Sequence, residues 1–296
     1  MRKTNVLITG ATGFIGNHLV QELNKPELRR KYNVVCFVRK PIIYNFILGS
    51  LEDKDSLHKA TKNIDRVVHL ASETRSSDKE LNYKINTIGT KNLIEACKKN
   101  KVKMLIFSGT VNADFKKKGV YGETKRQAEN IVKNSGLGYI ILKFNMVYGQ
   151  GDNNLTKTIK LVKKLPIIPI IGDGKKRLQP VYVKDVVYAI IKCLEHKQLN
   201  NKIYNIAGPK AITFNKYIDI ISNTLNIKKI KMHIPVFFVR LLLFFTGKAF
   251  DYIITIEILN SINQDKSMDI SDSQKDLGFN PKDLKTVLPY LVEKGI

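Results

Sequence analysis

Short apolar runs alternate with longer amphipathic stretches through the first half of the chain. The short runs lie at residues 5–9, 33–38, 66–70, 104–108 and 139–144. Because they are apolar at consecutive positions, they predict strands that are buried on both faces. The stretches at residues 13–24, 81–100 and 121–134 have the period of helices. Strands covered on both faces and joined by helices predict a doubly wound α/β fold with a parallel sheet.

The pattern changes after about residue 150. Loops rich in Gly, Asp and Pro precede a predicted helix at residues 184–195 and a strand-like run at 202–207. We therefore expect a main domain at residues 1–165 and a smaller C-terminal substrate-binding lobe at 166–296. Residues from about 180 to 207 have two alternatives, because they can also return to the main sheet.

Composition places the chain among ordinary globular proteins. Of its 296 residues, 43% are hydrophobic and 26% are charged, which excludes collagen-like, low-complexity and wholly disordered chains. The three cysteines are odd in number and far apart, so neither a disulfide framework nor a zinc site is expected. We predict no metal and a reducing, cytoplasmic environment. The first strand begins too early to leave room for a signal peptide.

One late stretch, residues 236–245, is strongly apolar. It is short of the roughly 20 residues that a spanning helix needs, and it contains Arg240. We interpret it as a core helix of the second lobe, with peripheral membrane contact as the alternative.

The formal net charge is +24, but its make-up argues against nucleic-acid binding. The cations are 41 lysines and only 9 arginines, scattered along the chain, whereas specific phosphate and base recognition favours the arginine fork. Such a positive field instead attracts anionic ligands such as nucleotides, and it favours anionic membrane surfaces.

A glycine-rich turn joins the first strand to the first helix. The order of strand, turn and helix is that of a Rossmann dinucleotide site, in which glycines allow close approach of a pyrophosphate to the helix N-terminus. We predict that cofactor binding involves Gly10, Thr12, Gly13, Phe14, Ile15 and Gly16. The second strand ends in Arg39-Lys40 without a carboxylate, which favours NADP, with NAD as the alternative.

Tyr121 and Lys125 lie four residues apart on a predicted helix and therefore face the same side. A tyrosine acting as an acid/base near pH 7 needs its pKa lowered by a neighbouring cation, which the lysine can supply in part. Thr110 and Ser108 end a strand at the edge of the sheet where ligands bind, and either hydroxyl could contact a substrate oxygen.

These motifs together resemble the extended short-chain dehydrogenase/reductase superfamily, in particular its NAD-dependent epimerase/dehydratase branch of nucleotide-sugar enzymes. The resemblance also rests on residues 69–71, 86–92, 145–149, 172–174, 181–186 and 204–208, in the same order along the chain. It implies a Rossmann fold, Tyr121 as the acid/base, Lys125 as its partner and ribose ligand, and a third hydroxyl at Thr110.

The resemblance implies further positions. Leu51, Leu70, Ala71 and Asn86 fall at cofactor-side positions, and Asn86 would help to hold the lysine. Ser108, Asn145 and Arg177 fall on the substrate side, where an arginine would bind a diphosphate. Relatives are usually homodimers built from two helices per subunit. The sequence departs from the family at residues 108–114 and at Lys143-Phe144, where many relatives have Arg-Pro.

Three functions stay open at this stage. The leading hypothesis is an NAD(P)-dependent epimerase or reductase that moves a hydride at a sugar carbon of a nucleotide sugar. The second is an NADPH-dependent reductase of a lipidic or steroid-like carbonyl, suggested by residues 236–245. The third is a non-catalytic NADPH-binding subunit or assembly factor, similar to the short-chain-dehydrogenase-like subunit of respiratory complex I.

Overall fold

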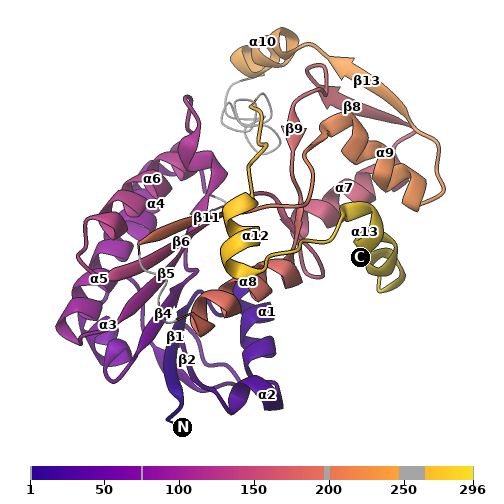
Figure 1. The fold of residues 1–296 in the computed structure, drawn as a ribbon. Helices are drawn as coiled ribbons and strands as arrows, with labels where there is room; N and C mark the ends of the chain where they lie inside the picture. Colours follow the sequence, from indigo (N-terminus) through magenta and orange to yellow (C-terminus); the bar gives the residue numbers. More distant parts are fainter. Residues whose placement is uncertain (1, 75, 197–200, 247–263, 296) are drawn as a thin grey trace.

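A seven-stranded parallel sheet forms the centre of the molecule in the computed structural model, which describes residues 2–74, 76–196, 201–246 and 264–295 (Figure 1). The strand order β11-β6-β5-β4-β1-β2-β3 is that of a doubly wound sheet, and it changes direction between β1 and β4. The strands are β1 (Thr4–Thr9), β2 (Tyr32–Val38), β3 (Phe46–Leu48), β4 (Arg66–His69), β5 (Met104–Thr110), β6 (Gly138–Phe144) and β11 (Lys202–Ile206). The predicted fold class is confirmed.

Helices cover both faces of this sheet, as the apolar strand sequences require. Along β1, Val6 and Ile8 face a cluster shared with α1 (Phe14–Leu23) and α8 (Val183–Glu195). Leu7 faces the opposite cluster, shared with α3 (Lys54–Thr61), α5 (Gly89–Lys99) and α6 (Val120–Lys133). All three strand residues are fully buried, and each contributes roughly 1.5 to 3 kcal/mol through burial. A short helix, α2 (Pro26–Arg29), follows α1.

The single helix predicted at residues 81–100 is interrupted. It consists of α4 (Lys79–Asn82), a π-helical segment (Tyr83–Ile88) and α5, with no break in the chain direction. The segment contains Asn86, whose backbone carbonyl accepts a hydrogen bond of 2.6 Å from Thr90 Oγ1. Single π-helical turns are rare and often occur at functional sites. Here the wider turn carries Asn86 on the side that faces α6.

The later lobe is built from short pieces around a third apolar cluster. Its helices are α7 (Asn153–Lys164), α9 (Phe214–Thr224) and α13 (Leu284–Glu293). Its strands form three two-stranded pairs: β7 (Val147–Tyr148) with β10 (Val181–Tyr182), β8 (Ile167–Ile171) with β13 (Ile230–Ile234), and β9 (Arg177–Leu178) with β12 (Ile212–Thr213). In Figure 1 this lobe lies to one side of the sheet.

The chain passes between the two parts more than once. β11 pairs in parallel with β6 and so belongs to the main sheet. Near the C-terminus, α12 (Ser271–Leu277) packs beside β11, where Tyr204 donates a 2.8 Å hydrogen bond to Asp276. Leu277 and Phe279 join the apolar cluster of α1 and α8. A domain boundary at residue 165 stays a prediction.

The apolar stretch near residue 240 forms α10 (Val236–Thr246), but its first turns are not a core helix. Phe237 is 68% exposed and Phe238 61% exposed, and among residues 236–241, whose side chains the structure describes, only Val239 is buried. The interpretation as a core helix is therefore wrong for residues 237, 238 and 241, because α10 lies at the tip of the lobe in Figure 1. Among the helices described, none is long and apolar enough to cross a membrane.

Candidate active site

The glycine turn after β1 packs so closely on neighbouring backbone that side chains would not fit at Gly10 or Gly16. Gly10 has a φ of +72°, and a Cβ there would lie 2.6 Å from the backbone nitrogen of Ala71. A Cβ on Gly16 would clash with the carbonyl of Gly10, so α1 packs directly on the turn. The helix begins after Gly13 with no side-chain cap and no acidic residue in its first turn. Its backbone N–H groups and its dipole are therefore available to an anion.

A cavity of about 230 Å³ opens beside this turn, over the point where the strand order reverses. The lining includes six predicted cofactor residues besides Gly10: Thr12, Gly13, Arg39, Leu51, Leu70 and Ala71. Arg39 is exposed at its rim. Phe14, Ile15 and Gly16 belong to the start of α1, beside the cavity. The open turn, the uncapped helix and the apolar walls fit a dinucleotide.

Tyr121 lies at the start of α6 between two hydroxyl groups. Its phenol hydrogen-bonds with Thr110, at the end of β5, and with Ser72, which follows β4. Burial raises the pKa of Tyr121 to about 12, while the hydrogen bonds with Thr110 and Ser72 act to lower it. The three hydroxyls thus form one cluster at the carboxyl ends of the strands. A ligand or cation that favours the phenolate is needed to bring this pKa toward neutrality.

Asn86 connects this cluster to the π-helical segment. Its Oδ1 accepts hydrogen bonds of 2.8 Å from Ser72 Oγ and from the Glu73 backbone nitrogen. Its Nδ2 donates to Thr124 Oγ1 at 3.1 Å, next to Lys125. Asn86 therefore fixes Ser72, one of the two partners of Tyr121, to the middle of α6.

Lys125 is buried one turn after Tyr121. Its Nζ lies over the Phe107 ring, 4.1 Å from the centroid, and makes no hydrogen bond within the described ranges. Burial lowers the pKa of Lys125 to about 7, and the charge of Glu129 partly opposes this shift. The ammonium is thus held in place by an aromatic face, and its donors remain for a ligand.

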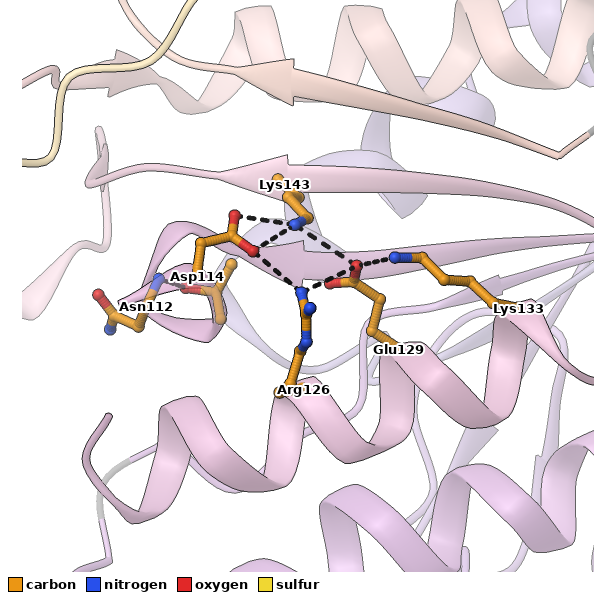
Figure 2. A network of polar contacts seen from close by, with 7 residues as sticks. Asn112, Asp114, Arg126, Glu129, Lys133 and Lys143 are labelled. Atoms are coloured by element: carbon orange, nitrogen blue, oxygen red, sulfur yellow. Dashed lines mark hydrogen bonds and ion pairs between the residues drawn. The ribbon is translucent and has the colours of Figure 1, made fainter. Parts of the chain in front are cut away.

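Behind Lys125, a network of charged residues joins α6 to β6 (Figure 2). Glu129 is fully buried, and its Oε1 lies 2.6 Å from Lys133 Nζ and 3.4 Å from Lys143 Nζ. Lys143 in turn contacts Asp114 at 2.7 Å, and Arg126 also contacts both carboxylates. Glu129 Oε2 has no hydrogen-bond partner among the described residues. The Glu129 carboxylate therefore lies one helical turn from Lys125, with its charge balanced by three cations and one of its oxygens without a hydrogen bond from any described residue.

The Ser108 hydroxyl is used within the sheet. It donates a 2.9 Å hydrogen bond to the carbonyl of His69, and the structure does not bring it to Tyr121. His69 itself bridges Thr9 and Thr90, and burial lowers its pKa to about 3. The neutral imidazole therefore links β1 to α5 through these two hydrogen bonds. Thr110, the other hydroxyl predicted, is the one beside Tyr121.

A second cavity, of about 330 Å³, extends from Thr110 toward the later lobe. Asn145 and Arg177 both line it, as predicted for substrate-side residues. Asn145 Nδ2 donates to the backbone carbonyl of Lys266, and Arg177 Nε lies 2.7 Å from Asp265. Burial lowers the pKa of Lys266, which also lines the cavity, to about 8.

Sequence reasoning missed three residues of this site. Ser72 follows β4 by three positions, and only the register of β4 with β5 brings it to Tyr121. Lys266 reaches the second cavity from a segment far along the chain. Glu129 carried a signal that was overlooked, because it continues the helix face of Tyr121 and Lys125 at intervals of four residues. Within the described residues, no group of acidic, histidine or cysteine side chains is arranged to hold a metal.

Comparison with known proteins decides the family. The model of the NAD dependent epimerase/dehydratase family matches residues 6–207. The chain belongs to this family. Sterol-4-alpha-carboxylate 3-dehydrogenase, decarboxylating, of Bos taurus is 30% identical over 259 residues, which span 77% of this chain and 72% of that protein. UDP-glucose 4-epimerase of Vibrio cholerae is 24% identical over 307 residues, or 94% and 90% of the two chains.

Solved structures agree with the fold. UDP-glucuronic acid 4-epimerase from Bacillus cereus, in complex with UDP-glucuronic acid and NAD, superposes with a TM-score of 0.77 at 23% identity and covers 98% of both chains. The relatives of this epimerase/dehydratase family member are epimerases, dehydratases and dehydrogenases, so the chain is an enzyme of the extended short-chain dehydrogenase type. The hypothesis of a non-catalytic subunit loses its support.

Proposed function

We propose that this enzyme transfers a hydride between a nicotinamide cofactor and a sugar carbon of a nucleotide-activated sugar, with Tyr121 as the acid/base. The observation that carries the proposal is the Tyr121 cluster, in which the phenol hydrogen-bonds with Ser72, which lines the first cavity, and with Thr110, which lines the second. Lys125 lies one helical turn after Tyr121, with its Nζ over the Phe107 ring. Nucleotide-sugar epimerases among the relatives and structural neighbours support the substrate class.

The residues of the cluster have separate tasks in this proposal. Tyr121 accepts the hydroxyl proton of the sugar on oxidation and returns it on reduction. Lys125 provides a positive charge that favours the phenolate, which offsets the burial that holds the pKa high. Thr110 hydrogen-bonds the same sugar oxygen and orients it, while Asn86 holds Ser72 against the phenol.

The cofactor would be held by the glycine turn, the start of α1, Leu51, Leu70, Ala71 and the ammonium of Lys125. When bound, a nicotinamide supplies the hydride acceptor and donor. We propose NADP as the preferred form because Arg39 at the rim of the cavity offers a cation for a 2′-phosphate. NAD is the cofactor named for the structural neighbour described above, and it is the alternative.

On the substrate side, we propose that the diphosphate of the nucleotide sugar binds near Arg177, Lys176 and Lys266. All three line the second cavity, and the net charge of +24 favours an anion there. Asn145 would bind the sugar or fix the loop that carries Lys266, to which it donates.

A second candidate function is the oxidation or reduction of a lipidic, steroid-like substrate. Two observations favour it: the exposed phenylalanines of α10, and the likeness to a sterol-4-alpha-carboxylate 3-dehydrogenase. The same Tyr121 and Lys125 would serve that reaction, so the distinction lies in the later lobe.

We also propose a cytoplasmic homodimer. The three cysteines are buried and free, which suits a reducing compartment. α5 and α6 are adjacent helices whose outer surfaces form a shallow groove of about 560 Å³, with the half-exposed Tyr83 at one end. Two such helices per subunit are the usual dimer surface in the family that the sequence resembles.

The test begins with the nicotinamide that copurifies with the protein, identified after denaturation. The loaded enzyme is then offered UDP-glucose, UDP-glucuronic acid and a sterol 4-alpha-carboxylate in parallel. The proposal expects turnover of a nucleotide sugar and loss of that turnover in Tyr121→Phe. Turnover of the sterol alone would favour the second candidate. A protein that binds no nicotinamide would contradict both.

A further inference from the structure

The β8–β13 pair exposes an apolar face to solvent. In the parallel register Ile167 lies opposite Ile230 and Pro169 opposite Met232, and all four side chains are exposed. Ile230 is 69% exposed and Met232 50% exposed. Alternation explains the arrangement, because the residues between them, such as Ile168 and Ile170, point into the third core cluster. When one face of a pair of strands contacts water, the residues on that face are normally polar.

The apolar face continues into α10, which follows β13 after one proline. Phe237, Phe238 and Leu241 are exposed and share one side of the helix. The two phenylalanine rings contact each other edge to face, with centroids 5.9 Å apart. Figure 1 shows α10 at the outer tip of the lobe, beyond β13 and away from α9. We call the whole surface the tip patch: Ile167, Pro169, Ile230, Met232, Phe237, Phe238 and Leu241.

The two chain segments that carry the tip patch are basic. Neither residues 153–171 nor residues 220–241 include an Asp or Glu. Five cations around the patch are exposed, and none of them makes an ion pair within the part of the chain that the structure describes: Lys160, Lys163, Lys164, Lys228 and Arg240. By contrast, Lys231, on the inner side of β13, pairs with Asp219 of α9.

We propose that the tip patch docks on the surface of an anionic lipid bilayer. Exposed aromatic and aliphatic side chains next to lysines match the interface between lipid headgroups and acyl chains. An acidic protein would suit the lysines but not the wide apolar face, and a second copy of this chain would bring like charges together. α10 has 11 residues, so it would lie in the interface and not span the bilayer.

The proposal is independent of the chemistry at Tyr121, and its test measures binding alone. Full-length protein loaded with nicotinamide is floated with vesicles of phosphatidylglycerol and phosphatidylcholine, and with vesicles of phosphatidylcholine only. We expect binding to the anionic vesicles that weakens as salt is added. The double variant Phe237→Glu/Phe238→Glu should lose at least tenfold in affinity, and Lys163→Glu/Lys164→Glu should lose the preference for phosphatidylglycerol.

The matched control is Ile43→Glu, which changes an aliphatic side chain that is 93% exposed but lies in the main domain. It should bind vesicles like the wild type. Retained nicotinamide binding shows that the variants are folded. Equal vesicle binding by wild type and Phe237→Glu/Phe238→Glu would overturn the proposal. A second outcome would also overturn it: the wild-type protein does not bind vesicles but forms dimers, and Phe237→Glu/Phe238→Glu does not form them. The tip patch would then bind a second copy of the chain.

Discussion

The two halves of the molecule use apolar residues in opposite ways. In the main sheet, Val6, Leu7 and Ile8 are apolar in sequence and fully buried, because helices cover both faces. In the later lobe, the equally apolar strand β8 leaves Ile167 and Pro169 exposed, next to the exposed Ile230 and Met232 of β13. The same local sequence signal therefore marks a core in one half and a surface in the other. What differs is whether a helix is available to cover the second face.

The halves also differ in how they hold charge. The main domain buries Lys125 and Glu129 one turn apart. Arg126, Lys133 and Lys143 all contact the Glu129 carboxylate (Figure 2). The later lobe keeps its cations at cavity walls and on the surface. A buried charge held over an aromatic ring therefore lies in the first half, whereas the second half has charges at the wall of a cavity. We expect substitutions in the first half to change catalysis and those in the second to change substrate binding.

The largest effect on cofactor binding should come from Gly10→Ala, which tests whether this binding depends on one close approach between two backbone segments. The new Cβ would lie 2.6 Å from the Ala71 nitrogen, and we expect at least a hundredfold weaker nicotinamide binding by titration. Gly136→Ala is the control. Its φ of +75° matches the +72° of Gly10, but nothing lies within 4 Å of its Cβ. Similar losses in both variants would mean that backbone strain, and not the clash, explains the result.

Lys125→Met should lower kcat about a hundredfold and should stabilise the cofactor-free protein at pH 6. Burial holds the pKa of Lys125 at about 7 in the folded protein, against roughly 10.4 when unfolded. The unfolded chain binds more protons between these values, so the free energy of unfolding of the wild type rises with pH from 7 to 10. The variant should therefore gain about 4 to 5 kcal/mol at pH 6 and little at pH 10, by denaturant titration.

Lys266→Met tests whether a buried lysine of the later lobe affects substrate binding, in contrast to Lys125 of the main domain. Burial also lowers the pKa of Lys266, to about 8, but this lysine lines the cavity of the later lobe. We expect roughly a tenfold rise in KM for the nucleotide sugar, with kcat within about twofold of the wild type. A fall in kcat as large as that of Lys125→Met would contradict the expectation that the main domain affects catalysis and the later lobe affects substrate binding.

Glu129→Gln should shift the pH profile of turnover toward acid by about one pH unit. The carboxylate raises the pKa of Lys125 against the effect of burial, so its removal lowers that pKa and leaves fewer charged lysines at pH 7. Turnover at pH 7 should fall up to tenfold and recover in more acidic buffer. Asp114→Asn is the matched control, because Asp114 binds the same Lys143 and Arg126 without facing Lys125. It should leave the pH profile in place.

The smallest effect concerns Arg39, which is exposed at the rim of the cofactor cavity. Arg39→Ala should weaken NADPH binding about tenfold and leave NAD binding unchanged, since only a 2′-phosphate would contact the guanidinium. Lys3→Ala, another exposed cation, serves as the control. Equal binding of both nucleotides before and after the change would withdraw the preference for NADP.

Much of the main domain was predictable from local sequence because each of its features has one local cause. Consecutive apolar residues required strands buried on both faces, and the glycine turn required a φ that Gly10 provides. Tyr121 and Lys125 were identified by their spacing on a helix together with their place after a strand and a dinucleotide turn. Ser72 was not, because its place beside the phenol depends on how β4 pairs with β5.

The later lobe was less predictable for physical reasons. Its strand pairs are two to five residues long and join segments far apart in the chain, such as β8 with β13. Short strands carry little periodicity, and pairing over long sequence separation leaves no local signal. The apolar residues of α10 were read as core because sequence shows hydrophobicity and not what covers it.

The central claim is that Tyr121 transfers the proton that accompanies hydride transfer. The direct measurement is a single turnover of nicotinamide-loaded enzyme with its nucleotide sugar, followed by the absorbance of the reduced cofactor, in Tyr121→Phe and Tyr148→Phe. Tyr148 is the control because its hydroxyl is buried in the later lobe, with no hydrogen-bond partner in the part of the chain that the structure describes. We predict reduction about a thousandfold slower in Tyr121→Phe, with sugar affinity unchanged, and a wild-type rate in Tyr148→Phe. Reduction at the wild-type rate in Tyr121→Phe would contradict the account.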